Sequence, residues 1–168
     1  DINELYVDIV ENLIHSNAEY LFHNNYEIIL RNHPRFDDKT CPNVNLNYDF
    51  IYFDNETPIN DLLDKVNIHM TFHSTSTFEA AVSGTPSILI DMHDHFSPNE
   101  TFLRQYKYPF DDLVMRDQED FSYILNLLNN KQIYNKKCED IYRWSKEIYQ
   151  DFDKSVFENL LLENIDNK

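Results

Sequence analysis

The chain has 168 residues, and its 30 acidic against 14 basic side chains give a net charge of −16. This length predicts a single domain, and a hydrophobic fraction of 42% is enough for a packed core, which excludes wholesale disorder. The charge argues against a general nucleic-acid binder, because phosphate backbones require a basic face. The single glycine, Gly84, excludes dinucleotide-binding and phosphate-loop motifs, both of which need several glycines.

The first half of the chain alternates between helix and strand patterns. Apolar residues recur at helical spacing from Ile2 to about Asn24. A short helix is expected after Thr57-Pro58, because the start of a helix tolerates the missing N–H of proline. Another helix begins directly after 74–77 and ends at Gly84, which suits the left-handed position that follows a helix. Strands are expected at 26–31, 50–53 and 67–72.

The second half continues this alternation. Strands are expected at 87–91 and 113–115, a helical piece at about 100–106, and helix from about Gln118 onward. Strands that alternate with helices predict a Rossmann-like α/β fold, a parallel sheet with helices on both faces. Ligands bind such sheets beyond the carboxyl ends of the strands. Three of the expected strands are followed by segments with candidate ligand-binding side chains.

The segment 73–79, His-Ser-Thr-Ser-Thr-Phe-Glu, lies between a strand and a helix. Hydroxyls and the unpaired N–H groups of a helix start suit a phosphate. The same letters are also typical of a capping box, in which Ser76 and Glu79 only begin the helix. The two interpretations are compatible, since a capped helix can still present Ser74 and Thr75 to a ligand.

The segment 31–35, Arg-Asn-His-Pro-Arg, follows the first strand. His33 beside two arginines is a reasonable anion clamp, and Pro34 biases His33 toward an extended conformation. A solvated turn with an incidental histidine would look the same.

The segment 91–95 contains His93 and His95 beside acids, which invites a metal interpretation. No further ligand is evident there, so we expect a loop at the rim of a cleft and no metal site. Cys41 and Cys138 match no metal or redox spacing, which makes a reducing cytosol the default.

The order of these segments resembles the C-terminal, donor-binding half of a glycosyltransferase of the GT-B type, which has two Rossmann-like domains. The resemblance covers about residues 26–91. The pairing of His-Pro with Ser/Thr-Ser is similar to bacterial capsule enzymes, sialyltransferases, Kdo transferases and teichoic-acid glycerophosphotransferases, which use cytidine-activated donors. The letters that carry the resemblance lie at 31–35, 58–63, 67–71 and 74–86.

The resemblance implies a role for each candidate residue. His33 would be the catalytic residue that stabilises the phosphate leaving group, Ser74, Thr75 and Ser76 would bind that phosphate, and Glu79 would reach the ribose. It also implies a donor substrate that is a sugar activated by CMP, CDP or UDP. We expect the reaction to be metal-independent and to need no cofactor.

The resemblance implies a larger whole. Residues 1–168 would form one donor-binding domain, whereas the complete enzyme needs an N-terminal domain for the acceptor. We therefore expect a fragment or subunit that binds the nucleotide sugar but is inactive alone. No apolar run approaches the roughly 18 residues of a membrane span. We expect a cytoplasmic location, with peripheral association of the full enzyme at the inner face of the cell membrane, and no nucleic-acid partner.

Two alternatives stay open at this point. A nucleotide-sugar 2-epimerase shares the fold and a His-Pro element, although such enzymes usually carry Ser-Gly-Gly where this chain has Ser-Thr-Ser-Thr. The other alternative is a noncatalytic α/β binding module, in which His33 and Ser74 would be ordinary loop residues.

Overall fold

The computed structural model describes residues 2–33, 44–72, 74–92 and 107–149. The strands are β1 (Ile28–Leu30), β2 (Ile51–Phe53), β3 (His69–Thr71), β4 (Ser87–Ile90) and β5 (Val114–Met115). The helices are α1 (Ile2–His23), α2 (Ile59–Leu63), α3 (Ser76–Val82), α5 (Glu119–Asn129) and α6 (Lys131–Ile148), and a 3-10 turn (Asp111–Leu113) leads into β5. The expected alternation is therefore confirmed over these ranges, while the helical piece expected at 100–106 lies outside the described residues.

All pairings between the described strands are parallel, as predicted. β1 pairs with β2, with Ile28 opposite Ile51, and a second sheet has the order β3-β4-β5, with His69 opposite Ser87. The sequence predicted one continuous sheet, but within the described ranges no backbone ladder joins β1 to β3. Strands of three residues offer few ladder bonds. Instead, Ile28 and Leu30 of β1 pack their side chains against the buried core.

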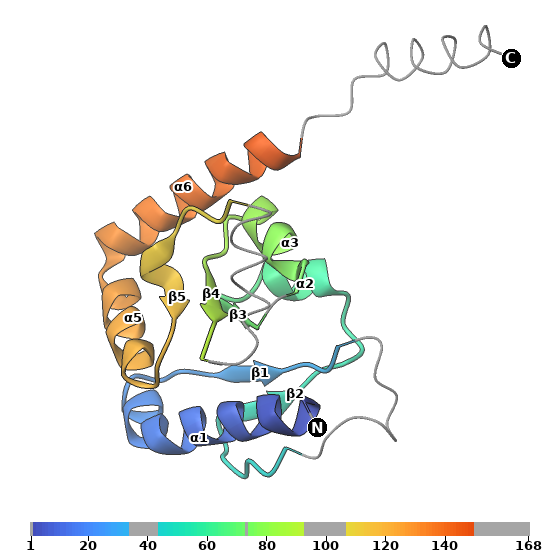
Figure 1. Cartoon of the computed structure of the whole chain (residues 1–168), viewed down its shortest axis with the longest axis vertical. Coiled ribbons are helices and arrows are strands. Elements are labelled where there is room, and N and C mark those ends of the chain that lie inside the picture. The colour runs from blue at the N-terminus through green and yellow to red at the C-terminus, as the bar shows by residue number, and fades with distance from the viewer. Residues whose placement is uncertain (1, 34–43, 73, 93–106, 150–168) are drawn as a thin grey trace, which may run out of the picture.

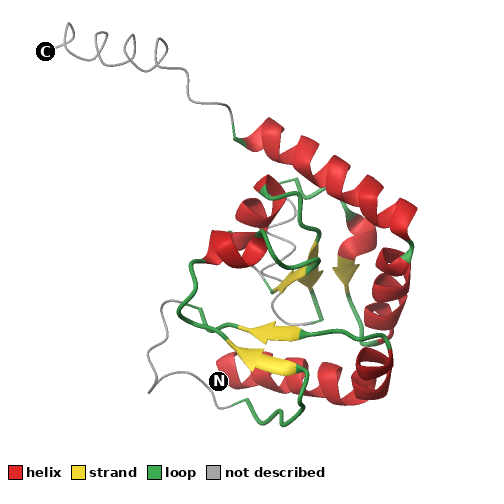
Figure 2. Cartoon of the chain, turned by 180° about the vertical axis from the view of Figure 1, so that it is seen from behind, coloured by secondary structure: helices red, strands yellow, loops and turns green. Residues whose placement is uncertain are grey.

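Helices flank both sheets in two groups (Figure 1). α3 contacts α2 and α6 and also packs on β3 and β4. α1 lies beside the β1–β2 sheet, which the view from behind also shows (Figure 2). The hydroxyl of Tyr20 on α1 donates a hydrogen bond of 2.8 Å to Asn126 Oδ1 on α5. The chain is thus a mixed α/β protein with small parallel sheets flanked by helices.

The core forms where these elements meet. β4 is buried along its whole length, as expected for the middle strand of a parallel sheet. α1 contributes Leu13, Ile14 and Leu21 to the same cluster. Further members come from the loop before β5, from β5 and from the two C-terminal helices; they include Tyr108, Phe110, Leu113, Met115, Phe121, Ile124, Leu125, Leu128, Ile141 and Trp144.

Two helix ends show how local chemistry sets the boundaries. Gly84 has a φ of 72° directly after α3, which confirms the left-handed position predicted for it. The sequence predicted unbroken helix from about Gln118, and this was wrong at Asn130. The side chain of Asn130 accepts hydrogen bonds from the backbone N–H groups of Gln132 and Ile133, which starts α6 as a separate helix.

Candidate functional site

The segment after β1 is fastened to the loop after β2. Arg31 Nη1 donates to the carbonyl oxygens of Asp54 and Thr57, and the backbone N–H of Asn32 donates to Asn55 Oδ1 at 2.9 Å. The guanidinium of Arg31 therefore braces the loop, whereas the sequence had suggested it as part of an anion clamp. His33 follows these two residues and is exposed.

The carboxylate of Asp54 organises that loop. It accepts hydrogen bonds from the N–H groups of Thr57 and Glu56, at 2.9 and 3.1 Å, and from Thr57 Oγ1 at 2.7 Å. The bonds from Thr57 and Glu56, together with the nearby Arg31 charge, hold the pKa of Asp54 below its ordinary value. Arg31 and Asn32, which precede His33, are thus bonded to a loop that is itself held by hydrogen bonds.

The segment after β3 begins α3 without the capping box. Thr75 is the N-cap residue and makes no side-chain capping bond. Instead, Ser74 Oγ accepts from the backbone N–H of Ser76 at 3.2 Å. The capping-box interpretation was therefore wrong, because Ser76 lies inside the helix and its hydroxyl contacts His69.

His69 on β3 connects α3 with β4. Its Nε2 lies 3.1 Å from Ser76 Oγ and its Nδ1 lies 3.0 Å from Ser87 Oγ. Burial lowers the pKa of His69 to about 4, so the imidazole is neutral at pH 7. No pattern in the sequence indicated this bridge. Serines 7 and 18 residues further along the chain carry no recognisable spacing signal.

Two buried polar atoms on α3 lack hydrogen-bond partners within the described part of the chain. They are Thr77 Oγ1 and Glu79 Oε2, and Thr77 is only 1% exposed. Buried polar atoms without partners are uncommon in folded proteins and call for an explanation, such as a bound ligand or water. Burial raises the pKa of Tyr149, and the charge of nearby Glu79 raises it further.

The segment after β4 is described only at its start. The backbone N–H of Asp91 donates to the carbonyl of Met115 at 2.7 Å. His93 and His95 lie outside the described residues. Within the described ranges, no group of three or more His, Cys, Asp or Glu side chains could hold a metal ion.

The structure brings part of the candidate set together. Ser74 and Thr75 lie in the connection from β3 into α3, and Ser76 and Glu79 lie in the first turn of α3. His33 follows β1, which belongs to the other sheet. Near the end of β3, the rings of Phe72 and Tyr6 of α1 stack with centroids 4.1 Å apart, so α1 is anchored beside this connection.

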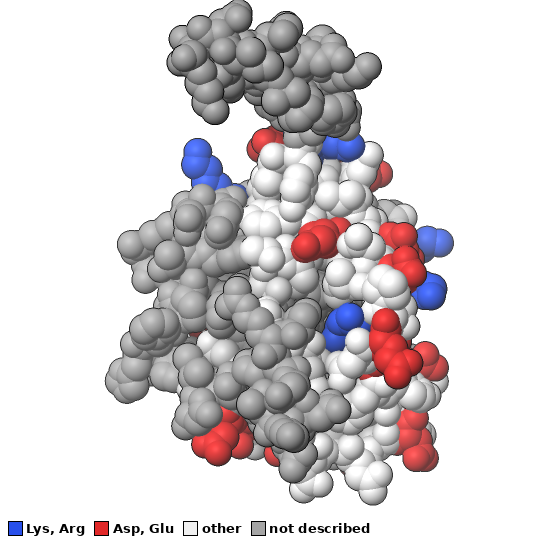
Figure 3. Space-filling model, turned by 90° about the vertical axis from the view of Figure 1, so that its right-hand side faces the viewer, with Lys and Arg blue, Asp and Glu red and all other residues white. Residues whose placement is uncertain are grey.

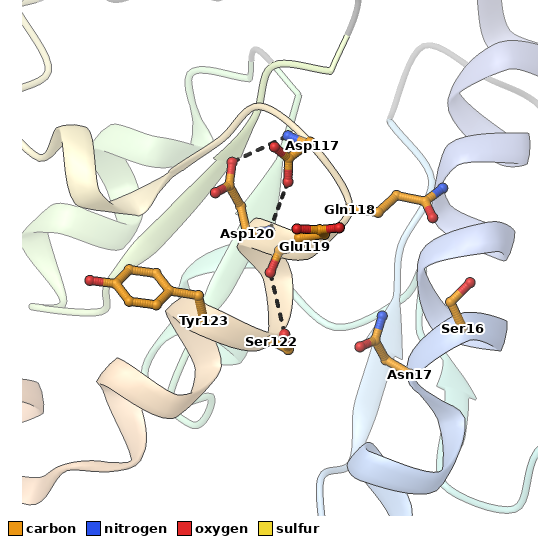
Figure 4. Close-up of a pocket in the computed structure, with 8 residues that line it drawn as sticks. All are labelled: Ser16, Asn17, Asp117, Gln118, Glu119, Asp120, Ser122 and Tyr123. Atoms are coloured by element: carbon orange, nitrogen blue, oxygen red, sulfur yellow. Dashed lines mark hydrogen bonds between the residues drawn. The ribbon is translucent and has the colours of Figure 1, made fainter.

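A separate hollow of about 710 Å³ lies between α1 and the start of α5 (Figure 4). Ser16 and Asn17 face it from α1, and the acidic residues Asp117, Glu119 and Asp120 line the other side. Among the described residues, the lining includes none of the candidates taken from the sequence. Three carboxylates would repel a phosphate, so this hollow does not suit an anionic ligand.

Acidic and basic side chains are interspersed on the described part of the face in Figure 3.

Comparison of the chain with protein-family models, with curated proteins and with solved structures found no match. None of the helices in the described ranges combines the length and hydropathy needed to cross a bilayer.

Proposed function

We propose that the chain is the donor-nucleotide-binding domain of a GT-B type glycosyltransferase that builds a bacterial surface polysaccharide. Its ligand is a sugar activated by a cytidine or uridine nucleotide. The domain binds the donor, and turnover requires a second domain that holds the acceptor.

The observation that carries this proposal is the connection from β3 into α3. Hydroxyl groups of Ser74, Thr75 and Ser76 follow the end of a parallel strand, where α/β sheets bind ligands. One turn further on, Glu79 Oε2 is buried and has no hydrogen-bond partner in the ranges that the structure describes. A carboxylate oxygen accepts from hydroxyl donors, and the ribose of a nucleotide supplies two of them.

The proposed chemistry uses hydrogen-bond donors. Cleavage of the bond between sugar and phosphate leaves negative charge on the phosphate, and preorganised donors aimed at this charge lower the barrier by a few kcal/mol each. The ring N–H of His33 supplies one donor, and the serine and threonine hydroxyls supply further donors. The hydrogen bonds of Arg31 and Asn32 hold the backbone just before His33 against the loop after β2.

The proposed reaction needs no metal. One Asp-x-Asp sequence, Asp151-Phe152-Asp153, lies outside the described residues and is of the kind that binds metal in other transferases. Donor binding should therefore be measured with and without EDTA. Equal affinity is expected, and loss of binding on chelation would contradict the metal-independent scheme.

Titration of the chain with CMP, CDP, UDP and GDP tests the proposal. We expect micromolar to millimolar binding of a cytidine or uridine nucleotide, weakened at least several-fold by His33→Ala. His23→Ala is the control, because His23 is also an exposed histidine but lies at the end of α1. Unchanged affinity in His33→Ala would remove the proposed phosphate contact, and no nucleotide binding at all would refute the function.

A further inference from the structure

The two ring nitrogens of His69 have different partners. Nδ1 faces Ser87 Oγ on β4, and Nε2 faces Ser76 Oγ on α3. A neutral imidazole donates from one nitrogen and accepts at the other. The position of its single proton therefore decides which of the two serines donates to the ring and which accepts from it.

The surroundings of the Ser87 hydroxyl determine which ring nitrogen of His69 carries the proton. Its side chain is 2% exposed, and among the described residues its hydroxyl has a hydrogen bond only with His69 Nδ1. If Nδ1 carried the proton, the hydroxyl proton of Ser87 would be buried without an acceptor. Leaving a buried donor unsatisfied is costly. Ser87 therefore donates to Nδ1, which must be the unprotonated nitrogen.

The tautomer of His69 also determines how the Ser76 hydroxyl can bond. With Nδ1 accepting, the imidazole proton sits on Nε2 and is donated to Ser76 Oγ. Ser76 is partly exposed, and its own hydroxyl proton is not used by His69. That proton can be donated to another group. In the opposite arrangement Ser76 would donate to His69 and present only oxygen lone pairs, which a phosphate oxygen repels.

We propose that His69 is a positioning residue that makes Ser76 a hydrogen-bond donor toward an anionic group of the ligand. The identity of that group as the donor phosphate rests on the proposed function, whereas the protonation of Nε2 does not. The hydrogen bonds run in one direction, from Ser87 to His69, from His69 to Ser76, and from Ser76 to the ligand.

The first test reads the imidazole directly. In the chain labelled with ¹⁵N-histidine, the signals of His69 are assigned by their loss in His69→Gln. We expect the nitrogen shifts of a ring protonated at Nε2 and bare at Nδ1 near pH 7. Ser87→Ala removes the donor that selects this tautomer, and a mixture of the two forms is expected. A proton on Nδ1 in the unmodified chain would overturn the inference.

The second test separates positioning from structure. CDP is titrated into the unmodified chain, Ser76→Ala, His69→Asn and His69→Gln. Loss of one hydrogen bond to a charged group is expected to weaken binding roughly ten- to a hundredfold in Ser76→Ala. His69→Gln should remain within about twofold, because its amide nitrogen can occupy the place of Nε2 and donate to Ser76. The shorter side chain of His69→Asn should behave like Ser76→Ala.

The double variant His69→Asn/Ser76→Ala should bind no more weakly than Ser76→Ala alone, because both changes remove the same interaction. Losses that multiply, or normal binding by His69→Asn, would overturn the inference. If the unmodified chain does not bind CDP, the proposed function fails and takes the ligand contact with it. If CDP binds and Nδ1 carries the proton, the function stands and the inference fails.

Discussion

The two connections that lead from a strand into α3 and α5 treat their polar groups in opposite ways. Before α5, the side chains of Asp117 and Asp120 each accept a hydrogen bond from the backbone N–H of the other, at 3.0 and 3.2 Å. Asp120 also accepts from the N–H of Arg116 at 2.7 Å. At the start of α3, Thr77 Oγ1 and Glu79 Oε2 are buried without a hydrogen-bond partner among the described residues. The side chains of Asp117 and Asp120 are thus paired within their own connection, whereas these two groups of α3 are not.

Charge separates the two connections further. The α5 connection concentrates carboxylates beside an open hollow, while the α3 connection begins with neutral hydroxyls. A concave surface alone would have pointed to α5. Hydrogen-bonding capacity and charge point to α3 as the better place for a phosphate, because its groups can donate without electrostatic repulsion.

Stability should depend on the protonation of His69. Burial lowers its pKa to about 4 from 6.5, so the unfolded chain binds a proton that the folded chain resists. The contribution to stability is complete above about pH 6.5 and is lost as the pH falls toward 4, by up to about 3 kcal/mol. Urea unfolding at several pH values measures it. His69→Gln cannot titrate and should show a correspondingly shallower decline; parallel curves for the two proteins would contradict the burial of a neutral ring.

Gly84→Ala should lower stability without affecting binding. The φ of 72° at this position is strained for any residue with a Cβ atom, at a cost of about 1–2 kcal/mol. Space is not the cause, since the nearest atom to an added Cβ, the carbonyl oxygen of Cys138, would be 3.6 Å away. Urea unfolding should show the loss, while the CDP affinity of the folded protein stays the same. A change in affinity would mean that the end of α3 is coupled to its start.

Loss of the Asp120 side chain should destabilise the protein more than loss of the Ser74 hydroxyl. Asp120→Ala removes the acceptor for two backbone N–H groups and should cost about 1 kcal/mol of unfolding free energy. Ser74→Ala removes one bond of 3.2 Å and should cost less. Asp120→Ala should leave CDP affinity unchanged, and Ser74→Ala should weaken it. Weaker CDP binding by Asp120→Ala with unchanged binding by Ser74→Ala would place the ligand at α5, and a larger loss of stability in Ser74→Ala would contradict the expected order of the two effects.

Glu79→Gln should have the smallest effect on stability, because the carboxylate oxygen that it alters has no hydrogen-bond partner to lose. We expect a change within about 0.5 kcal/mol, together with a CDP affinity that falls by about threefold. The 2′,3′-dideoxy form of CDP is the control ligand. If Glu79 holds the ribose, this analogue should bind the unmodified chain and Glu79→Gln equally well.

Much of the fold was predictable from local patterns. The helix of α1 and the turn at Gly84 follow from spacing and from glycine chemistry, and the strand positions follow from short apolar runs, although the observed strands are shorter. The division into two sheets was not predictable, because pairing between strands depends on contacts that lie far apart in sequence. Asn130 was also missed, since its capping role competes with a continuous apolar periodicity.

The candidate site was predictable only as a set of segments. The hydroxyls at 74–76 and Glu79 are visible in the sequence, and the structure places them in one connection. The side-chain contacts were not visible. The Ser76 hydroxyl could either form a capping box or bond to His69. In the structure it bonds to His69, because of tertiary packing that leaves no short-range pattern in the sequence. Arg31 likewise turned from a candidate ligand contact into a support for a neighbouring loop.

Backbone amide NMR of the ¹⁵N-labelled chain during titration with CDP tests the central claim most directly. The account predicts that the amide signals of residues 32–33 and 74–79 shift together with one dissociation constant. Signals of residues 117–123, which border the acidic hollow, should stay in place. Saturable shifts confined to 117–123, or none in 74–79 at millimolar CDP, would contradict the account.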